Sequence, residues 1–440
     1  MPSVTPTIDI HPQTALIDQP VSIRVAGLQP RQIVSLTAAL DLPGGLSYLS
    51  EASFIADMEG NIDLDTAVPL NGSYATADSH GLIWSLRVAG YSQRRPESAR
   101  YVESGLKPYD IRLRLYNISN HLLAQNVMMR LAVAPDVTRR DVRESGVVGT
   151  LFTPVEAQSA PRPAIIVVPG SNGGIPEQLA ALYASHGYSA LALGYFNAGD
   201  EGLLPKELVE IPLEYFQQAA QWLKSQPNVD EERVIIDGTS RGGELALLLG
   251  AYLDEFIAVI AWVPAAHVHH AFSSNEDLRQ RSAWTLEGKP LSFVPPASRP
   301  KGPRDVNLRN GSPVSHIEFL RMAASEPYFT DAAIPVENIN GPVLLISGRD
   351  DVMWPSAFFA DWVVERLKSA GFAHDVQHLS YDNVGHTIGP PHAPATILES
   401  YEKRSLHPYL YGGVPEYIAK ARVDVWPQVL RFIDDVTASS

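Results

Sequence analysis

Apolar and polar residues alternate with a period of two in several short runs within the first 135 residues. This period places successive side chains on opposite faces of a strand, and no long helical pattern interrupts it. Glycine, proline and asparagine separate the runs, as expected for turns between strands. Short strands at regular spacing are typical of an immunoglobulin-like β-sandwich, which we predict for residues 1–137. The clearest alternating runs are Val21–Val25, Ile33–Ala38, Ile111–Tyr116 and Val127–Val133.

The pattern changes between Ala134 and Val137, after which continuous apolar runs recur between segments of helical period. A strand without alternation is covered on both faces, and strands that alternate with helices build a parallel sheet. We therefore predict an α/β domain over residues 138–440, with a mostly parallel sheet covered by helices. Its expected strands include Ala164–Val168, Ser189–Leu193, Val234–Ile236, Ile257–Ala261 and Val343–Ile346, and its expected helices span 178–185, 212–225, 244–251, 356–370 and 423–436.

Residues 262–340 interrupt this alternation, because they show no clean period and contain many prolines. We predict that they form a cap-like insertion. The stretch 279–309 within it is locally basic. Its bases are either solvated residues of a loop or a surface that meets an anionic substrate. The charged residues are Arg279, Arg281, Lys289, Arg299, Lys301, Arg304 and Arg309, against Glu287 and Asp305.

Composition narrows the classes of function. A chain of 440 residues with 45% hydrophobic and 19% charged residues fits two folded domains. A net charge of -15 argues against a nucleic-acid partner. The absence of cysteine excludes disulfides, thiolate metal ligands and a cysteine nucleophile. We find no secretory signal and no apolar run of about 18 residues, so we expect a cytoplasmic protein with no membrane partner.

The segment Gly238-Thr-Ser-Arg-Gly242 lies between an apolar run and a helical segment. In that context a G-x-S-x-G sequence predicts a nucleophile elbow, a tight strand-to-helix turn that exposes the serine at the edge of the sheet. The glycines remove Cβ atoms that would clash in the turn. An ordinary Gly/Ser turn is the alternative. We predict that Ser240 is a catalytic nucleophile and that the domain is an α/β-hydrolase.

A serine nucleophile needs a histidine base and an acid that orients the histidine. In this fold the acid follows the nucleophile in the chain and precedes the histidine. Two adjacent acids, Asp350 and Asp351, follow the apolar run that ends at Gly348. The spacing Gly-x-x-Asp-x-x-x-Pro favours Asp351, with Asp350 as the alternative. His386 follows a glycine in a loop late in the chain and is the predicted base.

The oxyanion formed in such a reaction needs two backbone N–H donors. We expect one from Arg241, the residue after the nucleophile, and the other from Ser171 in the glycine-rich loop Pro169–Gly174. This loop lacks the lysine and the spacing of a phosphate-binding loop, so no nucleotide cofactor is predicted. The histidine cluster at 267–270 has no carboxylate at ligand spacing, so no metal is predicted either.

With these residues in place, both halves of the chain resemble the acyl-CoA thioesterase and bile acid-CoA:amino acid N-acyltransferase family. This resemblance implies an acyl-CoA thioester substrate and a triad of Ser240, Asp351 and His386. It also implies that serine in the elbow passes the acyl group to water, whereas the conjugating enzymes carry cysteine and pass it to an amino acid. The matching stretches are Leu16–Pro30, Ala52–Asp57, Gly72–Tyr74, Gly81–Leu86, Gly238–Glu244, Ser282–Thr285, Gly288–Pro290, Asp350–Trp354 and Gly385–Pro391.

The motifs predict a serine hydrolase, and the resemblance implies that it cleaves an acyl-CoA thioester to the free acid and coenzyme A. The phosphates of coenzyme A are then the anionic groups that a basic cap would meet. One alternative keeps the triad but changes the reaction, to an acyltransferase acting on an amine or an esterase or lactonase acting on a secondary metabolite. A second alternative is that the β-sandwich is a partner-binding module. The sequence does not reveal the acyl chain length or the oligomeric state.

Overall fold

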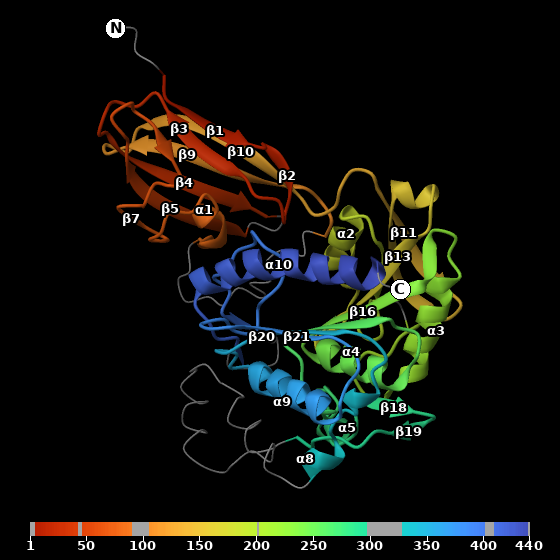
Figure 1. Cartoon of the computed structure of the whole chain (residues 1–440). Coiled ribbons are helices and arrows are strands. Elements are labelled where there is room, and N and C mark those ends of the chain that lie inside the picture. Colours follow the sequence, from red (N-terminus) through yellow and green to blue (C-terminus); the bar gives the residue numbers. More distant parts are fainter. Residues whose placement is uncertain are drawn as a thin grey trace, which may run out of the picture. The chain divides into compact units, whose positions relative to one another are not determined.

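The structure, a computed structural model, describes residues 5–42, 46–89, 105–199, 202–296, 328–400 and 409–438. The chain forms two compact units, which Figure 1 shows coloured along the sequence. The sequence pattern predicts the change of architecture near residue 137, but it does not reveal the two later segments that join the first unit. Unit 1 contains Met1–Ala132, Pro390–Ser405 and Val414–Asp424, and unit 2 contains Val133–Gly389, Leu406–Gly413 and Val425–Ser440.

Unit 1 is built around two β-sheets. The larger sheet has the order β2-β10-β9-β4-β5-β7, with β8 paired to β5, and the smaller has the order β1-β3-β6. Along β4 every second residue is buried, as the alternating sequence predicts. Among the described residues up to 132, the only helix is the short α1 (Gly81–Trp84). The strands are β1 (Thr7–His11), β2 (Thr14–Leu16), β3 (Ser22–Ala26), β4 (Ile33–Asp41), β5 (Ser47–Ile55), β6 (Ile62–Asp63), β7 (Asn71–Gly72), β8 (Arg87–Val88), β9 (Tyr109–Asn117) and β10 (Leu122–Leu131).

An eight-stranded sheet forms the centre of unit 2, in the order β11-β12-β14-β13-β16-β17-β20-β21. Strand β12 is antiparallel to both of its neighbours, β11 and β14. All neighbouring strands from β14 to β21 in this order are parallel. This order with one reversed strand is that of an α/β-hydrolase, which confirms the predicted fold. The strands are β11 (Val137–Glu144), β12 (Val147–Pro154), β13 (Arg162–Val168), β14 (Ser189–Leu193), β16 (Val229–Thr239), β17 (Ala258–Trp262), β20 (Val343–Gly348) and β21 (Val376–Tyr381).

Helices cover both faces of this sheet. Figure 1 shows α2 and the C-terminal part of α10 on one face, and α4 and α9 on the other. The rings of Tyr183 in α2 and Trp426 in α10 lie 5.2 Å apart, consistent with their common face. Helix α4 is buried from its first residue almost to its end, because it packs against the central strands β16 and β17. The main helices are α2 (Glu177–Ser185), α3 (Leu213–Lys224), α4 (Arg241–Tyr252), α9 (Ser356–Ser369) and α10 (Pro415–Ala438).

The predicted insertion contains only short elements in its described parts, residues 262–296 and 328–340. Strand β18 pairs with β15 (Ile211–Pro212) and β19, outside the main sheet. Residues 297–327 lie outside the described residues, and with them the basic positions Arg299, Lys301, Arg304 and Arg309 and the acidic Asp305. The remaining short elements are η1 (Val155–Gln158), α5 (Glu276–Arg279), β18 (Trp284–Leu286), β19 (Lys289–Pro290), α8 (Tyr328–Asp331), η2 (Val336–Asn338), β22 (Glu399–Ser400) and β23 (Tyr409–Leu410).

Candidate active site

Ser240 occupies the tight turn between β16 and α4. Its backbone has φ 61° and ψ -118°, a combination sparsely populated by residues that carry a side chain. Its N–H donates a hydrogen bond of 2.8 Å to the carbonyl of Trp262, which ties the turn to the neighbouring strand β17. A strained serine between a central strand and a buried helix is the geometry of a nucleophile elbow.

Neighbouring glycines make room for this turn. A Cβ atom on Gly238 would lie 2.0 Å from the carbonyl oxygen of Gly242, and one on Gly242 would lie 2.7 Å from that of Pro169. Both positions therefore exclude a side chain. The loop after β13 also lies against the elbow, since a Cβ atom on Gly170 would be 3.3 Å from the Cβ of Ser240. The glycine-rich loop that the sequence singles out is thus next to the serine.

His386 bridges Ser240 and Asp351. Its Nε2 lies 2.9 Å from Oγ of Ser240, and its Nδ1 lies 2.8 Å from Oδ2 of Asp351. An ionised carboxylate can only accept, so Nδ1 carries the proton and Nε2 presents its lone pair to the serine hydroxyl. The Asp351 side chain is fully buried, and that of His386 is 9% exposed. The structure brings together three residues that are up to 146 positions apart in the chain.

Asp351, rather than the adjacent Asp350, contacts the histidine. Asp350 is exposed. Asp351 accepts three further hydrogen bonds, from the N–H groups of Met353 and Trp354 at 3.0 and 3.3 Å and from Oγ of Ser356 at 2.7 Å. These bonds fix both carboxylate oxygens and hence the orientation of the histidine. The sequence pattern assigns no role to Ser356, although it is a hydroxyl residue at the start of a predicted helix, five positions after the acid.

The imidazole of His386 is also held by its backbone and by two aromatic rings. The backbone N–H of His386 donates to the carbonyl of Tyr411 at 2.8 Å, and the Tyr411 ring lies nearly parallel to the imidazole at a centroid distance of 6.2 Å. The Trp354 ring meets the imidazole edge-on at 5.9 Å. Tyr411 was not foreseen, because a loop contact across 25 positions leaves no periodic pattern in the sequence.

Of the two amides expected to stabilise an oxyanion, one follows Ser240 in the sequence and the other precedes it. Arg241 is the first residue of α4, so its N–H has no acceptor within the helix, and the helix dipole favours negative charge there. Ser171 directly follows Gly170, the residue packed against Ser240. The arrangement places the predicted nucleophile, the predicted base and the two predicted donors within one small region of unit 2.

Two buried carboxyl groups next to the turn have pKa values shifted in opposite directions. Burial raises the pKa of Asp237 to about 7, although hydrogen bonds from Trp262 and Tyr183 oppose the change. Burial also raises the pKa of Glu244, but the Arg241 guanidinium and further hydrogen bonds outweigh it, so this pKa lies below its usual value. Glu244 is therefore a buried carboxylate held by an adjacent positive charge.

The histidine cluster at 267–270 has a carboxylate neighbour after all. Glu244 lies 3.2 Å from Nδ1 of His269, a contact that sequence spacing could not show because the two residues are 25 positions apart. Among the described residues, no group of three or more His, Cys, Asp or Glu side chains has the arrangement of a metal site.

The described bases of the insertion are Arg279, Arg281 and Lys289. Arg281 forms an ion pair with Glu210 and is therefore already neutralised. Lys289 is exposed and Arg279 is half-buried. The role of the basic stretch in meeting an anionic substrate stays a prediction.

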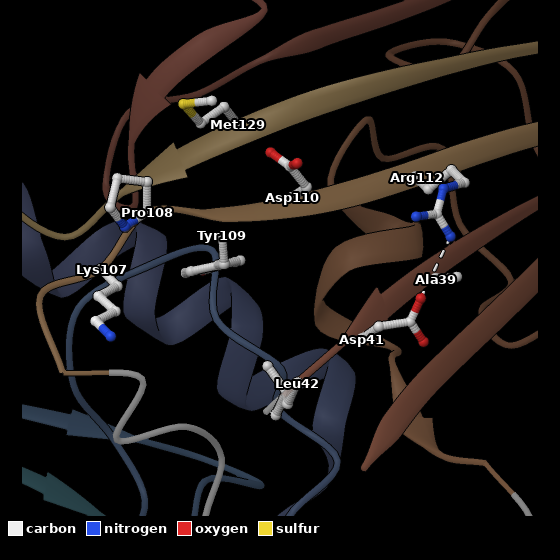
Figure 2. A pocket seen from close by; sticks show the side chains of 9 residues that line it. All are labelled: Ala39, Asp41, Leu42, Lys107, Pro108, Tyr109, Asp110, Arg112 and Met129. Atoms are coloured by element: carbon white, nitrogen blue, oxygen red, sulfur yellow. Dashed lines mark hydrogen bonds and ion pairs between the residues drawn. The ribbon is translucent and has the colours of Figure 1, made fainter. Parts of the chain in front are cut away.

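A surface hollow of about 410 Å³ lies in unit 1 and is shown in Figure 2. It mixes charges of both signs, and Arg112 reaches across to pair with Asp41 at 3.3 Å. Its lining contains no serine and no histidine, and none of the residues that surround Ser240. The hollow therefore offers no serine nucleophile and no histidine base. Its lining residues are Ala39, Asp41, Leu42, Lys107, Pro108, Tyr109, Asp110, Arg112 and Met129.

No helix among the described residues is long and apolar enough to cross a membrane. Proteins similar to this chain include one named peroxisomal and one named mitochondrial, so the cytoplasmic location stays a prediction.

The chain matches two family models and many curated proteins. The model of the BAAT/acyl-CoA thioester hydrolase C-terminal region matches residues 211–439, and that of the acyl-CoA thioester hydrolase/BAAT N-terminal region matches residues 18–144. The chain is 32% identical to human acyl-coenzyme A thioesterase 2, mitochondrial, over 94% of this chain and 81% of the relative. It is 30% identical to mouse peroxisomal succinyl-coenzyme A thioesterase, over 94% and 93% of the two chains. It is also 30% identical to mouse acyl-coenzyme A amino acid N-acyltransferase 1, over 96% and 95%. The chain therefore belongs to the acyl-CoA thioester hydrolase/BAAT family.

Proposed function

We propose that this protein hydrolyses acyl-CoA thioesters, with Ser240 as nucleophile, His386 as general base and Asp351 as the acid that orients the histidine. The observation that carries the proposal is the pair of hydrogen bonds at His386, 2.9 Å to Ser240 and 2.8 Å to Asp351. Membership of the family, and relatives named as acyl-CoA thioesterases, support the substrate class.

Acylation begins when Oγ of Ser240 attacks the thioester carbonyl and Nε2 of His386 takes the hydroxyl proton. Asp351 stabilises the imidazolium that forms. The backbone N–H groups of Arg241 and Ser171 donate to the oxyanion of the tetrahedral intermediate. When the C–S bond breaks, His386 gives its proton to the departing sulfur, and coenzyme A leaves as the thiol.

Deacylation repeats the same steps with water as the nucleophile. His386 takes a proton from the water, which attacks the acyl carbonyl bound to Oγ of Ser240. The second tetrahedral intermediate collapses, His386 returns the proton to Oγ, and the free acid departs. The side chain of His386 is partly exposed at 9%, which is compatible with the approach of water to its Nε2.

The test is release of coenzyme A thiol from acyl-CoAs of graded chain length, followed with a thiol reagent. We expect Ser240→Ala to reduce the rate by several orders of magnitude, roughly 10⁴-fold or more. No thiol release by the wild-type protein at any chain length would contradict the proposal.

A matched control is available within the same unit. Ser347 is also bonded to a histidine, His378, at 2.7 Å, and that histidine contacts Asp361 at 3.1 Å. Ser347 is fully buried in β20, so a substrate cannot reach its hydroxyl. Ser347→Ala should therefore keep thiol release, whereas Ser240→Ala abolishes it. Equal loss in both variants would indicate damage to the fold rather than to a nucleophile.

A second candidate is acyl transfer to an amine, favoured by the relative that is named an amino acid N-acyltransferase. The two reactions share every step up to the acyl-enzyme and differ only in the acceptor. Adding glycine or taurine to the thiol-release assay and analysing the products by mass spectrometry separates them. An amide product supports transfer, and free acid alone supports hydrolysis. Faster turnover of simple nitrophenyl esters than of any acyl-CoA would instead favour a general esterase.

A further inference from the structure

A buried carboxylate lies directly behind the elbow, on the first turn of α4. Glu244 has no exposed surface. Its Oε2 accepts from Arg241 at 3.0 Å and from Nδ1 of His269 at 3.2 Å. Its Oε1 accepts from Nε1 of Trp284 at 2.8 Å and from the N–H of His269 at 3.1 Å. A buried charge is stable only when it is paired and hydrogen-bonded, and Glu244 meets both conditions with partners from three segments.

The first partner, Arg241, connects Glu244 to the elbow. Its guanidinium is buried, and besides Glu244 it donates to the carbonyls of His270 at 3.1 Å and His269 at 3.4 Å. The side chain is therefore fastened between α4 and the segment that follows β17. Because the backbone N–H of the same residue is the proposed oxyanion donor, the side-chain contacts limit the movement of that donor.

The second partner, Trp284, connects Glu244 to the other oxyanion loop. Its ring packs against that of Tyr195 with a centroid distance of 5.7 Å. The buried hydroxyl of Tyr195 donates to the carbonyl of Pro169 at 2.9 Å. Pro169 opens the loop that carries Ser171, so the contact holds the second proposed donor from behind.

The third partner, His269, connects Glu244 to the acid and the base. Its Nδ1 faces two acceptors, Glu244 and the carbonyl of His267 at 3.0 Å, so this nitrogen carries the proton. Its ring packs on Trp354 at a centroid distance of 5.3 Å. The backbone N–H of Trp354 in turn donates to Asp351, and its ring meets the ring of His386.

We propose that Glu244 is a positioning residue whose carboxylate holds both oxyanion donors and the Asp351–His386 pair in register with Ser240. The inference rests on the proposed function, because it assigns Glu244 a task in the same reaction. Removal of its charge leaves the Arg241 guanidinium buried without its counter-ion and loosens all three connections together. The carboxylate touches neither the substrate nor the reacting atoms, so its effect falls on turnover rather than on binding.

The test compares Glu244→Gln with the wild type in three measurements: kcat and KM for acyl-CoA hydrolysis, the rate at which a fluorophosphonate labels Ser240, and thermal unfolding. Labelling by a fluorophosphonate needs the same nucleophile and oxyanion donors but no acyl-CoA. We expect kcat and the labelling rate to fall together by about 10- to 100-fold, which is at most the decrease in kcat caused by removing one oxyanion donor. We expect KM to change by less than about threefold.

Tyr195→Phe is the second variant, and it provides the test if Glu244→Gln does not fold. It removes only the hydroxyl that holds the Pro169 carbonyl, and it should lower kcat and the labelling rate by about 3- to 10-fold. The control is Ser189→Ala, which removes a buried hydroxyl bonded to the carbonyl of Asn228 at 3.0 Å, at the opposite end of β14. This control should keep both rates.

A folded Glu244→Gln protein with wild-type kcat and labelling rate overturns the inference. If that variant does not fold, unchanged rates in Tyr195→Phe overturn it. An equal loss of both rates in Ser189→Ala also overturns it, since general loosening of the domain would then suffice. Wild-type protein that is labelled at Ser240 but releases no thiol contradicts the proposed substrate alone, and the labelling rates of the variants still decide on Glu244.

Discussion

Replacing Asp351 with asparagine tests the direction of each hydrogen bond around the histidine. Oδ1 of Asp351 accepts from the N–H groups of Met353 and Trp354, and Oδ2 accepts from His386 and Ser356. An asparagine has to keep its carbonyl oxygen beside the two backbone N–H groups, because its NH₂ group would find no acceptor there. The NH₂ group then faces Nδ1 of His386 and donates to it. The histidine is forced into the tautomer that is protonated on Nε2, which cannot take the serine proton.

The expected loss of activity is large and the expected loss of stability is small. Trapping the histidine of a Ser-His-Asp triad in this tautomer lowers kcat by roughly 10⁴-fold, or about 5.5 kcal/mol of transition-state stabilisation. All four contacts of residue 351 can persist in the variant, with donor and acceptor exchanged at His386 and Ser356. Four bonds to a charged group become four bonds to a neutral one, so we expect the free energy of unfolding to fall by only about 1–2 kcal/mol.

The assay is thiol release from an acyl-CoA that the wild-type protein cleaves, with urea unfolding measured in parallel. Asp350→Asn is the matched control, because it makes the same chemical change at the adjacent, exposed position. We expect Asp350→Asn to keep wild-type kcat. If Asp351→Asn retained more than about a tenth of the wild-type kcat, the deduced tautomer would be wrong. If Asp350→Asn lost activity to the same extent, Asp351 would not be the orienting acid.

Three further changes probe the surroundings of the turn and unit 1. Gly238→Ala would place a Cβ atom 2.0 Å from the carbonyl oxygen of Gly242, so urea titration should show a free energy of unfolding lower by about 2–4 kcal/mol, with loss of hydrolysis. Burial raises the pKa of Asp237 from 3.8 to about 7, so the protonated side chain stabilises the folded state at pH 4. The free energy of unfolding should fall by on the order of 4 kcal/mol as the pH rises from 4 to 7, and Asp237→Asn should flatten this slope. Burial lowers the pKa of His392 from 6.5 to about 4, so stability present above pH 6.5 is lost as the pH falls towards 4, and His392→Gln should reduce this acid sensitivity in thermal unfolding.

The central strands and the turn were predictable because each has a strong local cause. Ser189–Leu193 coincides with β14, and Ala164–Val168 lies within β13, since strands covered on both faces carry apolar residues at every position. The turn around Ser240 was predictable because only glycine tolerates the close backbone approach on either side. The order of acid and histidine after the serine follows from the fold, so the G-x-S-x-G motif also indicates where in the chain the other two residues lie.

Other elements left no local pattern. Strand β11 (Val137–Glu144) is an edge strand in which only Val142 is fully buried. Most of its residues are therefore polar, and they show no apolar run that would predict a strand. Helix α4 begins at Arg241 rather than at residue 244, because the glycines that look like helix breakers are required by close packing. Helix α10 begins at Pro415, eight positions before the predicted start at 423. The contacts of Glu244 lie 25 and 40 positions away, beyond any periodicity.

The strained turn at Ser240 is a property of the packed domain rather than of the G-x-S-x-G sequence. A residue with a side chain at such backbone angles costs on the order of 1–3 kcal/mol. The hydrogen bond from its N–H to Trp262 contributes about 1 kcal/mol, which does not cover the upper part of that range. The remainder has to come from α4, whose Leu245 and Leu248 are fully buried and contribute about 1.5–3 kcal/mol each. An isolated peptide with the sequence of the turn lacks that packing, so it relaxes to unstrained angles, and the serine acquires its geometry only when α4 is packed against β16 and β17.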